Sequence, residues 1–135
     1  MADKNLHEEL NEKMFKTLVD SRISSKMKAN MFAKFIEDGA DVNAKYMYGK
    51  TVLMFASERG ENEIAKMLIE KGADVNAKND GRDTALLKAV REGNSEIAKM
   101  LLEKGADVQQ KNDDGYTALM LASLRGEKEI VKNQE

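Results

Sequence analysis

One five-residue stretch, Gly72-Ala73-Asp74-Val75-Asn76, decides the fold because it occurs three times at a constant spacing. Gly39-Ala40-Asp41-Val42-Asn43 lies 33 residues before it, and Gly105-Ala106-Asp107-Val108-Gln109 lies 33 residues after it. Glycine ends helices and permits a positive φ, so its positions mark turns. The six remaining glycines keep the same period to within one residue, as Gly60, Gly93 and Gly126, and as Gly49, Gly81 and Gly115.

Apolar residues repeat with helical spacing between these glycines. Ile64, Met67 and Leu68 lie at i, i+3 and i+4, which places them on one face of a helix. The same face recurs at Ile97, Met100 and Leu101. Each unit is therefore predicted to be a short helix, a glycine stop, a longer helix, a second glycine stop and an extended loop. Such a unit buries its apolar stripe only against neighbours, which predicts a solenoid.

These features resemble the ankyrin-repeat family, which has a 33-residue period and a Thr-Pro-Leu-His signature. The resemblance covers about Ala29 to Val131 and includes the alanines Ala56, Ala89 and Ala122. It implies an all-α repeat solenoid of stacked ankyrin helix-turn-helix units with β-hairpin finger loops. The signature proline and histidine are missing from all three copies, Thr51-Val52-Leu53-Met54, Thr84-Ala85-Leu86-Leu87 and Thr117-Ala118-Leu119-Met120. We therefore expect the histidine's hydrogen bonds between units to be lost and the array to depend on apolar packing.

The period divides one continuous domain into four parts. They are N-terminal capping helices with a degenerate first repeat (1–45), two ankyrin repeats (46–78 and 79–111) and a shortened C-terminal repeat (112–135). The second repeat's fingertip glycine comes one position early, so its loop should differ from the others.

The two terminal parts depart from the internal pattern. The first helix is indicated by Leu6, Leu10, Met14 and Leu18, and the second by a face of Met27, Met31, Phe35 and Ile36. The joint at 20–25 ends in serines suited to capping the second helix. After Ile130-Val131 the chain turns polar, where internal units continue with Met-Leu-Ile or Met-Leu-Leu. This indicates either a polar cap or a truncated array with an open apolar edge.

Composition argues against several classes of function. The 22 basic and 24 acidic residues are scattered and leave a net charge of -2, which does not favour nucleic-acid binding. No apolar run approaches the ~18 residues needed to span a bilayer, and the N-terminus lacks a signal-peptide core, so we expect a cytoplasmic protein. The chain has no cysteine and only one histidine, His7, which leaves Ser/His and Cys/His catalysis unsupported. We expect no catalysis, metal or cofactor.

The family resemblance implies that a partner protein binds to the finger tips and to the inner face of the short helices. The candidates by position are Tyr46, Met47, Tyr48, Lys50, Glu58 and Arg59, then Asp80, Arg82, Asp83, Lys88, Arg91 and Glu92, and finally Asp113, Tyr116, Leu124 and Arg125. All three tyrosines of the chain are among them, and tyrosine and arginine dominate interface hot spots. Exposed tyrosines are also common in β-hairpins through propensity alone.

Two further interpretations follow for this surface. Lys88 stands where other units have Phe55 and Leu121, so it either pairs with an acidic group of a partner or, as we favour, extends into solvent. The leading hypothesis is a monomeric, non-catalytic protein-interaction adaptor. The alternative is a self-assembling, engineered or truncated array that contacts copies of itself through its C-terminal edge.

Overall fold

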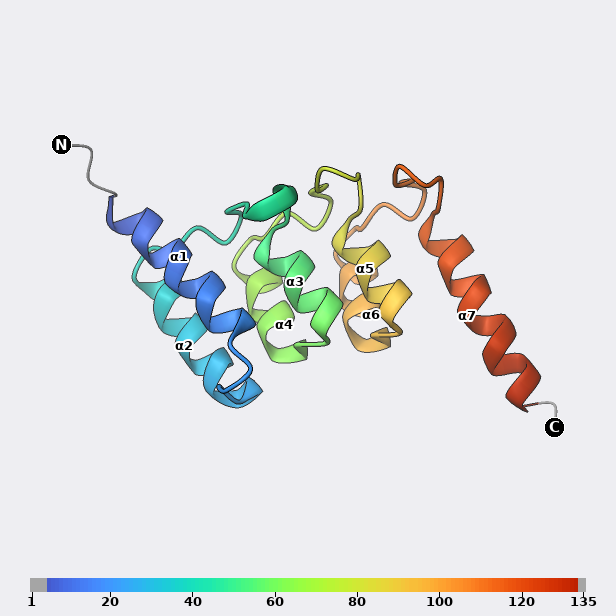
Figure 1. Ribbon diagram of the computed structural model, residues 1–135, viewed down its shortest axis with the longest axis horizontal. Coiled ribbons are helices and arrows are strands. Elements are labelled where there is room, and N and C mark those ends of the chain that lie inside the picture. Colours follow the sequence, from blue (N-terminus) through green and yellow to red (C-terminus); the bar gives the residue numbers. More distant parts are fainter. Residues whose placement is uncertain (1–4, 134–135) are drawn as a thin grey trace.

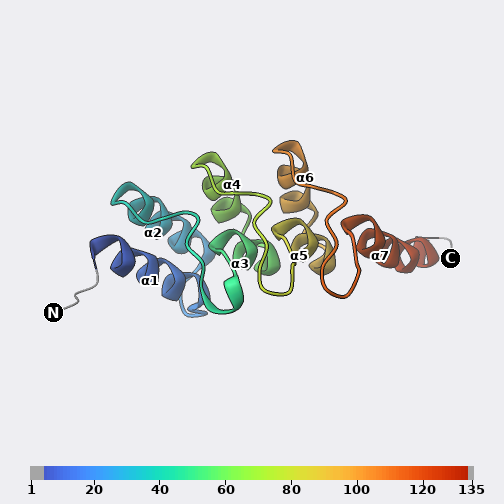
Figure 2. The ribbon, with the colours of Figure 1, turned by 90° about the horizontal axis from the view of Figure 1, so that it is seen from above.

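A computed structural model describes the backbone of residues 5–133 and the side chains of residues 5–126. Its helices are α1 (Leu6–Val19), α2 (Ser25–Glu37), the 3-10 turn η1 (Met47–Gly49), α3 (Val52–Arg59), α4 (Asn62–Glu70), α5 (Ala85–Glu92), α6 (Ser95–Glu103) and α7 (Ala118–Asn133). Helix pairs stack along one axis, with α1 and α2 at one end and α7 at the other (Figure 1). From above, α1, α3, α5 and α7 form one row and α2, α4 and α6 a second (Figure 2). The all-helical repeat solenoid is confirmed.

Threonine begins each short helix and glycine ends the first two. The hydroxyl oxygens of Thr51, Thr84 and Thr117 each accept a hydrogen bond of 3.2 Å from the backbone N–H three residues later. Such a cap is worth about 1 kcal/mol, so these helices begin without the signature proline. Gly60 and Gly93 then adopt a left-handed conformation, each with φ of 75°. This turns the chain back into the longer helix of the same unit.

The core lies between the two rows of helices. Leu53 and Met54 of α3 and Leu86 and Leu87 of α5 are almost fully buried, because each short helix has a neighbour on both sides. The longer helices contribute the predicted stripe, with Ile64, Leu68, Ile97 and Leu101 buried and Met67 and Met100 partly buried. Each such side chain contributes roughly 1.5–3 kcal/mol when it leaves water, so stacking is the main source of stability.

The two N-terminal helices pack partly as predicted, because Leu6 of the predicted α1 face is exposed. Leu10, Met14 and Leu18 are buried, and the Ser24 hydroxyl caps α2 by accepting from the Met27 N–H at 3.2 Å. Met27, however, is exposed, and Ala29 and Phe32 are buried in its place. The predicted face was correct only in part: Phe35 and Ile36 pack against the core, but α2 also buries Lys28, whose ammonium lies 3.7 Å from the Glu61 carboxylate.

Asparagines link successive loops. We had expected apolar packing alone to hold the units together, and these polar contacts correct that expectation. The Asn43 side-chain oxygen accepts from the Asp74 N–H at 2.7 Å, and Asn76 accepts from Asp107 at the same distance. The Asn43 and Asn76 amides also donate to the carbonyls of Gly72 and Gly105, at 3.4 and 3.2 Å. We call these contacts the asparagine ladder. They supply polar ties between units in a chain that lacks the signature histidine.

We expect Asn76→Ala to lower the free energy of unfolding by about 1–2 kcal/mol, because it removes two hydrogen bonds between units. Urea denaturation followed by circular dichroism measures this. Gln109 occupies the same position in the last loop, and its side chain makes no hydrogen bond among the described residues. Gln109→Ala is therefore the matched control and should be neutral. Equal losses in both variants would contradict the role given to the ladder.

The finger loops carry less β-structure than the resemblance implied. One isolated bridge joins Lys45 to Thr51, and the part of the chain described by the structure contains no strand. The other two loops are closed at their base by backbone hydrogen bonds from the Asn79 N–H to the Asp83 carbonyl at 3.0 Å and from the Asn112 N–H to the Tyr116 carbonyl at 3.1 Å. Each has a second one within the turn, from the Arg82 N–H to the Asn79 carbonyl at 3.0 Å and from the Gly115 N–H to the Asn112 carbonyl at 2.9 Å. They are tight turns, and β-hairpins here remain a prediction.

The middle finger differs from the others, as its early glycine predicted. Gly49 and Gly115 take positive φ values of 72° and 83° at the equivalent position of their loops. In the middle loop this position is held by Arg82, with a φ of 64°, because Gly81 precedes it by one residue. A side chain in the left-handed region is strained, which predicts that this loop is less stable than the third one. The first loop carries a similar strain at Tyr48, whose φ is 61°.

Arg82→Gly should raise the free energy of unfolding by about 0.5–1 kcal/mol, since relief of the strain outweighs the added freedom of the unfolded chain. The reciprocal change, Gly115→Ala, should lower it by about 1 kcal/mol, because nothing lies within 4 Å of the added methyl group and only the backbone is affected. Chemical denaturation tests both variants. A loss of stability in Arg82→Gly would show that the arginine side chain is needed.

The C-terminal unit departs from the predicted pattern at its glycine. α7 continues through Gly126 as one helix, whereas the chain turns back at Gly60 and Gly93. An open groove of about 440 Å³ therefore remains beside α6, lined in part by Ala98, Leu102 and Ala122. The predicted stop fails because the sequence beyond Ile130 and Val131 is polar, so a second helix would bury little. The side chains of Ile130 and Val131 lie outside the described residues.

Candidate partner-binding surface

The finger loops form a row along one side of the solenoid (Figure 1). Backbone hydrogen bonds of 2.9 Å join the tips, from the Asp80 N–H to the Tyr48 carbonyl and from the Asp113 N–H to the Gly81 carbonyl. Each tip is thus fixed to the next one, independently of side-chain contacts. We call these connected tips the finger row.

The structure leaves most of the candidate side chains exposed. Tyr48 is 73% exposed and Met47 59%, and Tyr116 also reaches solvent. The other exposed candidates are Arg59, Asp80, Arg82, Glu92, Asp113, Leu124 and Arg125. Five candidates are only partly exposed, namely Tyr46, Lys50, Glu58, Asp83 and Arg91, and Lys88 is buried.

Tyr46 belongs to the packing of the chain rather than to its open surface. Its ring stacks on Phe15 with centroids 4.7 Å apart, and its hydroxyl donates to the Asn11 carbonyl at 2.6 Å. Burial raises the pKa of Tyr46 well above its usual value, and the nearby charges of Asp41 and Glu12 add to this shift. The residue therefore fastens α1 to the first finger.

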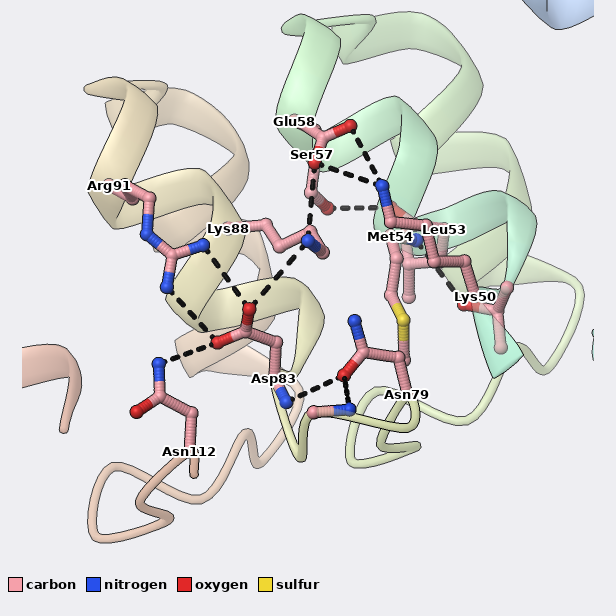
Figure 3. A network of polar contacts seen from close by, with 12 residues as sticks. Lys50, Leu53, Met54, Ser57, Glu58, Asn79, Asp83, Lys88, Arg91 and Asn112 are labelled. Atoms are coloured by element: carbon pink, nitrogen blue, oxygen red, sulfur yellow. Dashed lines mark hydrogen bonds and ion pairs between the residues drawn. The ribbon is translucent and has the colours of Figure 1, made fainter. Parts of the chain in front are cut away.

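Five charged candidates form a single network below the finger row (Figure 3). The Glu58 carboxylate lies 3.3 Å from the Lys50 ammonium and 3.2 Å from that of Lys88. Lys88 also lies 3.7 Å from Asp83, which pairs with the Arg91 guanidinium at 3.1 and 3.2 Å. Positive and negative groups alternate from α3 to α5, so the network joins two units. We call it the charge network.

Both carboxylates of the charge network have lowered pKa values. Burial alone would raise the pKa of Glu58, but hydrogen bonds and charge from Lys88 and Lys50 outweigh it. Burial likewise opposes ionisation of Asp83, and its bonds to Arg91 and Asn112, with the charges of Arg91 and Lys88, hold its pKa below the usual range. Both groups are therefore ionised near neutral pH and held in place by cations.

The structure corrects our expectation for Lys88. Its side chain is buried and does not extend into solvent. Its ammonium is already paired with Glu58 and Asp83 of the same chain, so it is not free to pair with an acidic group of a partner. The sequence did not reveal this, since Glu58 comes from the neighbouring unit, 30 residues away. Lys88 takes the place of an apolar residue because two carboxylates surround its ammonium.

Three asparagines that support this surface were missed in the sequence. Asn79 and Asn112 begin the second and third tips, where each side-chain oxygen accepts two backbone N–H groups of its own loop at 2.9–3.0 Å. The Asn112 amide also donates to Asp83 at 2.9 Å. Asn94 donates to the Ser57 carbonyl at 2.7 Å and so joins the two short-helix ends. The 33-residue spacing of Asn79 and Asn112 was the available signal.

The charge network should make stability depend on acidity. Because the pKa values of Glu58 and Asp83 are lowered on folding, their contribution is full above the unfolded pKa values of about 4 and is lost as pH falls below these through the folded ones. Lys88→Met removes the shared cation. We expect it to lower the free energy of unfolding by about 1–2 kcal/mol at pH 7 and by less at pH 3, where the carboxylates begin to be protonated.

Urea denaturation at the two pH values measures this difference. Lys99→Met is the matched control, because Lys99 is exposed and forms no ion pair among the described residues. It should shift stability equally at both pH values. A Lys88→Met variant with the same deficit at pH 3 as at pH 7 would show that the loss comes from packing and not from charge.

The chain was compared with known protein families and with curated proteins. A family model described as ankyrin repeats (3 copies) matches residues 22–112 and 77–133. A search of curated proteins found no match. Within the described residues, no helix is long and apolar enough to cross a membrane, and no group of three or more His, Cys, Asp or Glu residues could hold a metal ion.

Proposed function

Because the chain belongs to the ankyrin-repeat family, whose members are generally non-catalytic protein-interaction modules, we propose that it is an adaptor that binds a partner protein along its finger row. The observation that carries this proposal is the pair of backbone hydrogen bonds joining consecutive tips, at 2.9 Å each. A surface that is already ordered loses little conformational entropy on binding. The finger row can therefore present its side chains at fixed spacing.

The side chains of the finger row suit a protein partner. Tyr48 and Met47 offer exposed apolar surface at one end, and Tyr116 offers an aromatic ring at the other. Charged groups of both signs lie between them, on Asp80, Arg82 and Asp113. Aromatic contacts surrounded by polar groups are typical of interface hot spots and their rims.

The charge network supports the finger row instead of contacting the partner. Lys50, Glu58, Asp83, Lys88 and Arg91 neutralise one another, and breaking these pairs to form new ones would carry a desolvation cost. Their role in the proposal is to fix the second finger against α3 and α5. Tyr46 has the same supporting role for the first finger, through Phe15 and Asn11.

The test compares the wild-type chain with a Tyr48→Ala/Tyr116→Ala variant. Each is used to recover partners from a host lysate, and the recovered protein is then purified and titrated by calorimetry. We expect the double variant to bind at least about tenfold more weakly, as the loss of hot-spot aromatics does. Circular dichroism should show equal folding, because both rings are exposed.

A Leu6→Ala/Met27→Ala variant is the matched control, since it removes two exposed apolar side chains at the N-terminal end, away from the second and third fingers. It should bind with wild-type affinity. If instead the control loses affinity and the tyrosine variant keeps it, the partner binds at the N-terminal end and the proposal fails.

A further inference from the structure

The outer face of α7 is apolar and exposed, although the same positions are buried in the preceding units. Leu119 is 73% exposed and Leu124 50%, and Met120 is also exposed. The residues equivalent to Leu119 and Met120 in α5 are Leu86 and Leu87, each only 1% exposed, because α7 packs over them. α7 therefore has the same kind of apolar surface that α5 buries against α7. On α7, no described residue covers this surface.

Among the described side chains, this face carries no charge. Leu119, Met120, Ser123 and Leu124 fall on one side of the helix, opposite the buried Ala118 and Leu121. The neighbouring Arg125 does not add a mobile charge there, because its guanidinium donates to the Arg91 carbonyl on α5 at 3.0 Å. We call Leu119, Met120, Ser123 and Leu124 the α7 face.

The opposite end of the solenoid has a different chemistry. Exposed residues of α1 include Glu8, Glu9, Lys13 and Lys16. If a second copy stacked head to tail, these charges would lie near the α7 face and lose water without gaining partners, which is unfavourable. The asparagine ladder also ends at the C-terminal unit, where Gln109 replaces asparagine and makes no side-chain hydrogen bond among the described residues. Head-to-tail continuation of the stack is therefore disfavoured.

We propose that the α7 face binds the α7 face of a second copy, in a two-fold symmetric dimer that continues the α3, α5 and α7 row across the symmetry axis. A two-fold interface brings a surface against itself, and the four side chains of the α7 face carry no charge, so they meet their copies without like-charge repulsion. The patch is small, so the dimer is expected at the weak end of protein interfaces. This inference rests on side chains of α7 alone, so it does not depend on the proposed partner binding through Tyr48 and Tyr116.

Sedimentation velocity over a range of protein concentrations from about 5 to 500 μM tests the proposal, since weak interfaces have dissociation constants in the micromolar range or above. The wild-type mass should rise from that of one 15.1 kDa chain to twice this value. Leu119→Glu/Leu124→Glu should remain monomeric throughout, and its fold should persist because both side chains are exposed. Leu6→Glu/Met27→Glu, at the N-terminal end, is the matched control and should dimerise normally.

A single-cysteine variant distinguishes the symmetry of the contact. The chain has no cysteine, so Ser123→Cys places one thiol at the centre of the α7 face. In the two-fold dimer the two thiols meet and should form a disulfide-linked dimer on mild oxidation, which Ser95→Cys, exposed at the start of α6, should not. A wild-type chain that stays monomeric at every concentration would overturn the proposal. So would masses that grow beyond a dimer and collapse in the Leu6→Glu/Met27→Glu variant.

Discussion

Every other feature of this protein depends on the stacking of short helices against one another. α3 and α5 carry apolar side chains on both flanks, and neither could keep Leu53, Met54, Leu86 and Leu87 out of water without neighbours. Burial of this row supplies the free energy that holds the solenoid together. The threonine caps and the glycine turns only set where each helix begins and ends. The finger row exists because the stacked helices bring successive loops to the same side.

Polar contacts give this apolar stack its register. The asparagine ladder ties each loop to the next, and the charge network ties α3 to the second finger and α5. The ladder and the Lys88–Glu58 pair connect residues about one repeat apart, so they form only when adjacent units are correctly aligned. Lys88 illustrates the cost of such specificity, because its buried ammonium is tolerated only with Glu58 and Asp83 in place.

The periodic features could be predicted from the sequence, whereas features involving two units could not. Glycine spacing and the Ile64, Met67 and Leu68 pattern predicted helices, turns and a stack of units, because these follow from local backbone preferences and from one helical face. The partners of Lys88 and the stacking of Tyr46 on Phe15 depend on side chains from different units. The burial of Lys28, Ala29 and Phe32 in α2 was missed because the face was predicted from Met27, Met31, Phe35 and Ile36 alone. The continuation of α7 through Gly126 was missed because a glycine ends a helix here only when the following helix has an apolar face to bury.

The nearest-neighbour character of the stack has a consequence for how the molecule comes apart. α3 contacts α1, α4 and α5, and α5 contacts α3, α6 and α7, so no helix depends on one several units away. Opening of an end unit therefore leaves the remainder nearly undisturbed, and the chain can fray inward from its termini instead of unfolding all at once. With one flank of α7 unsupported, fraying should begin at the C-terminal end. The central units, which carry the charge network, would be the last to open.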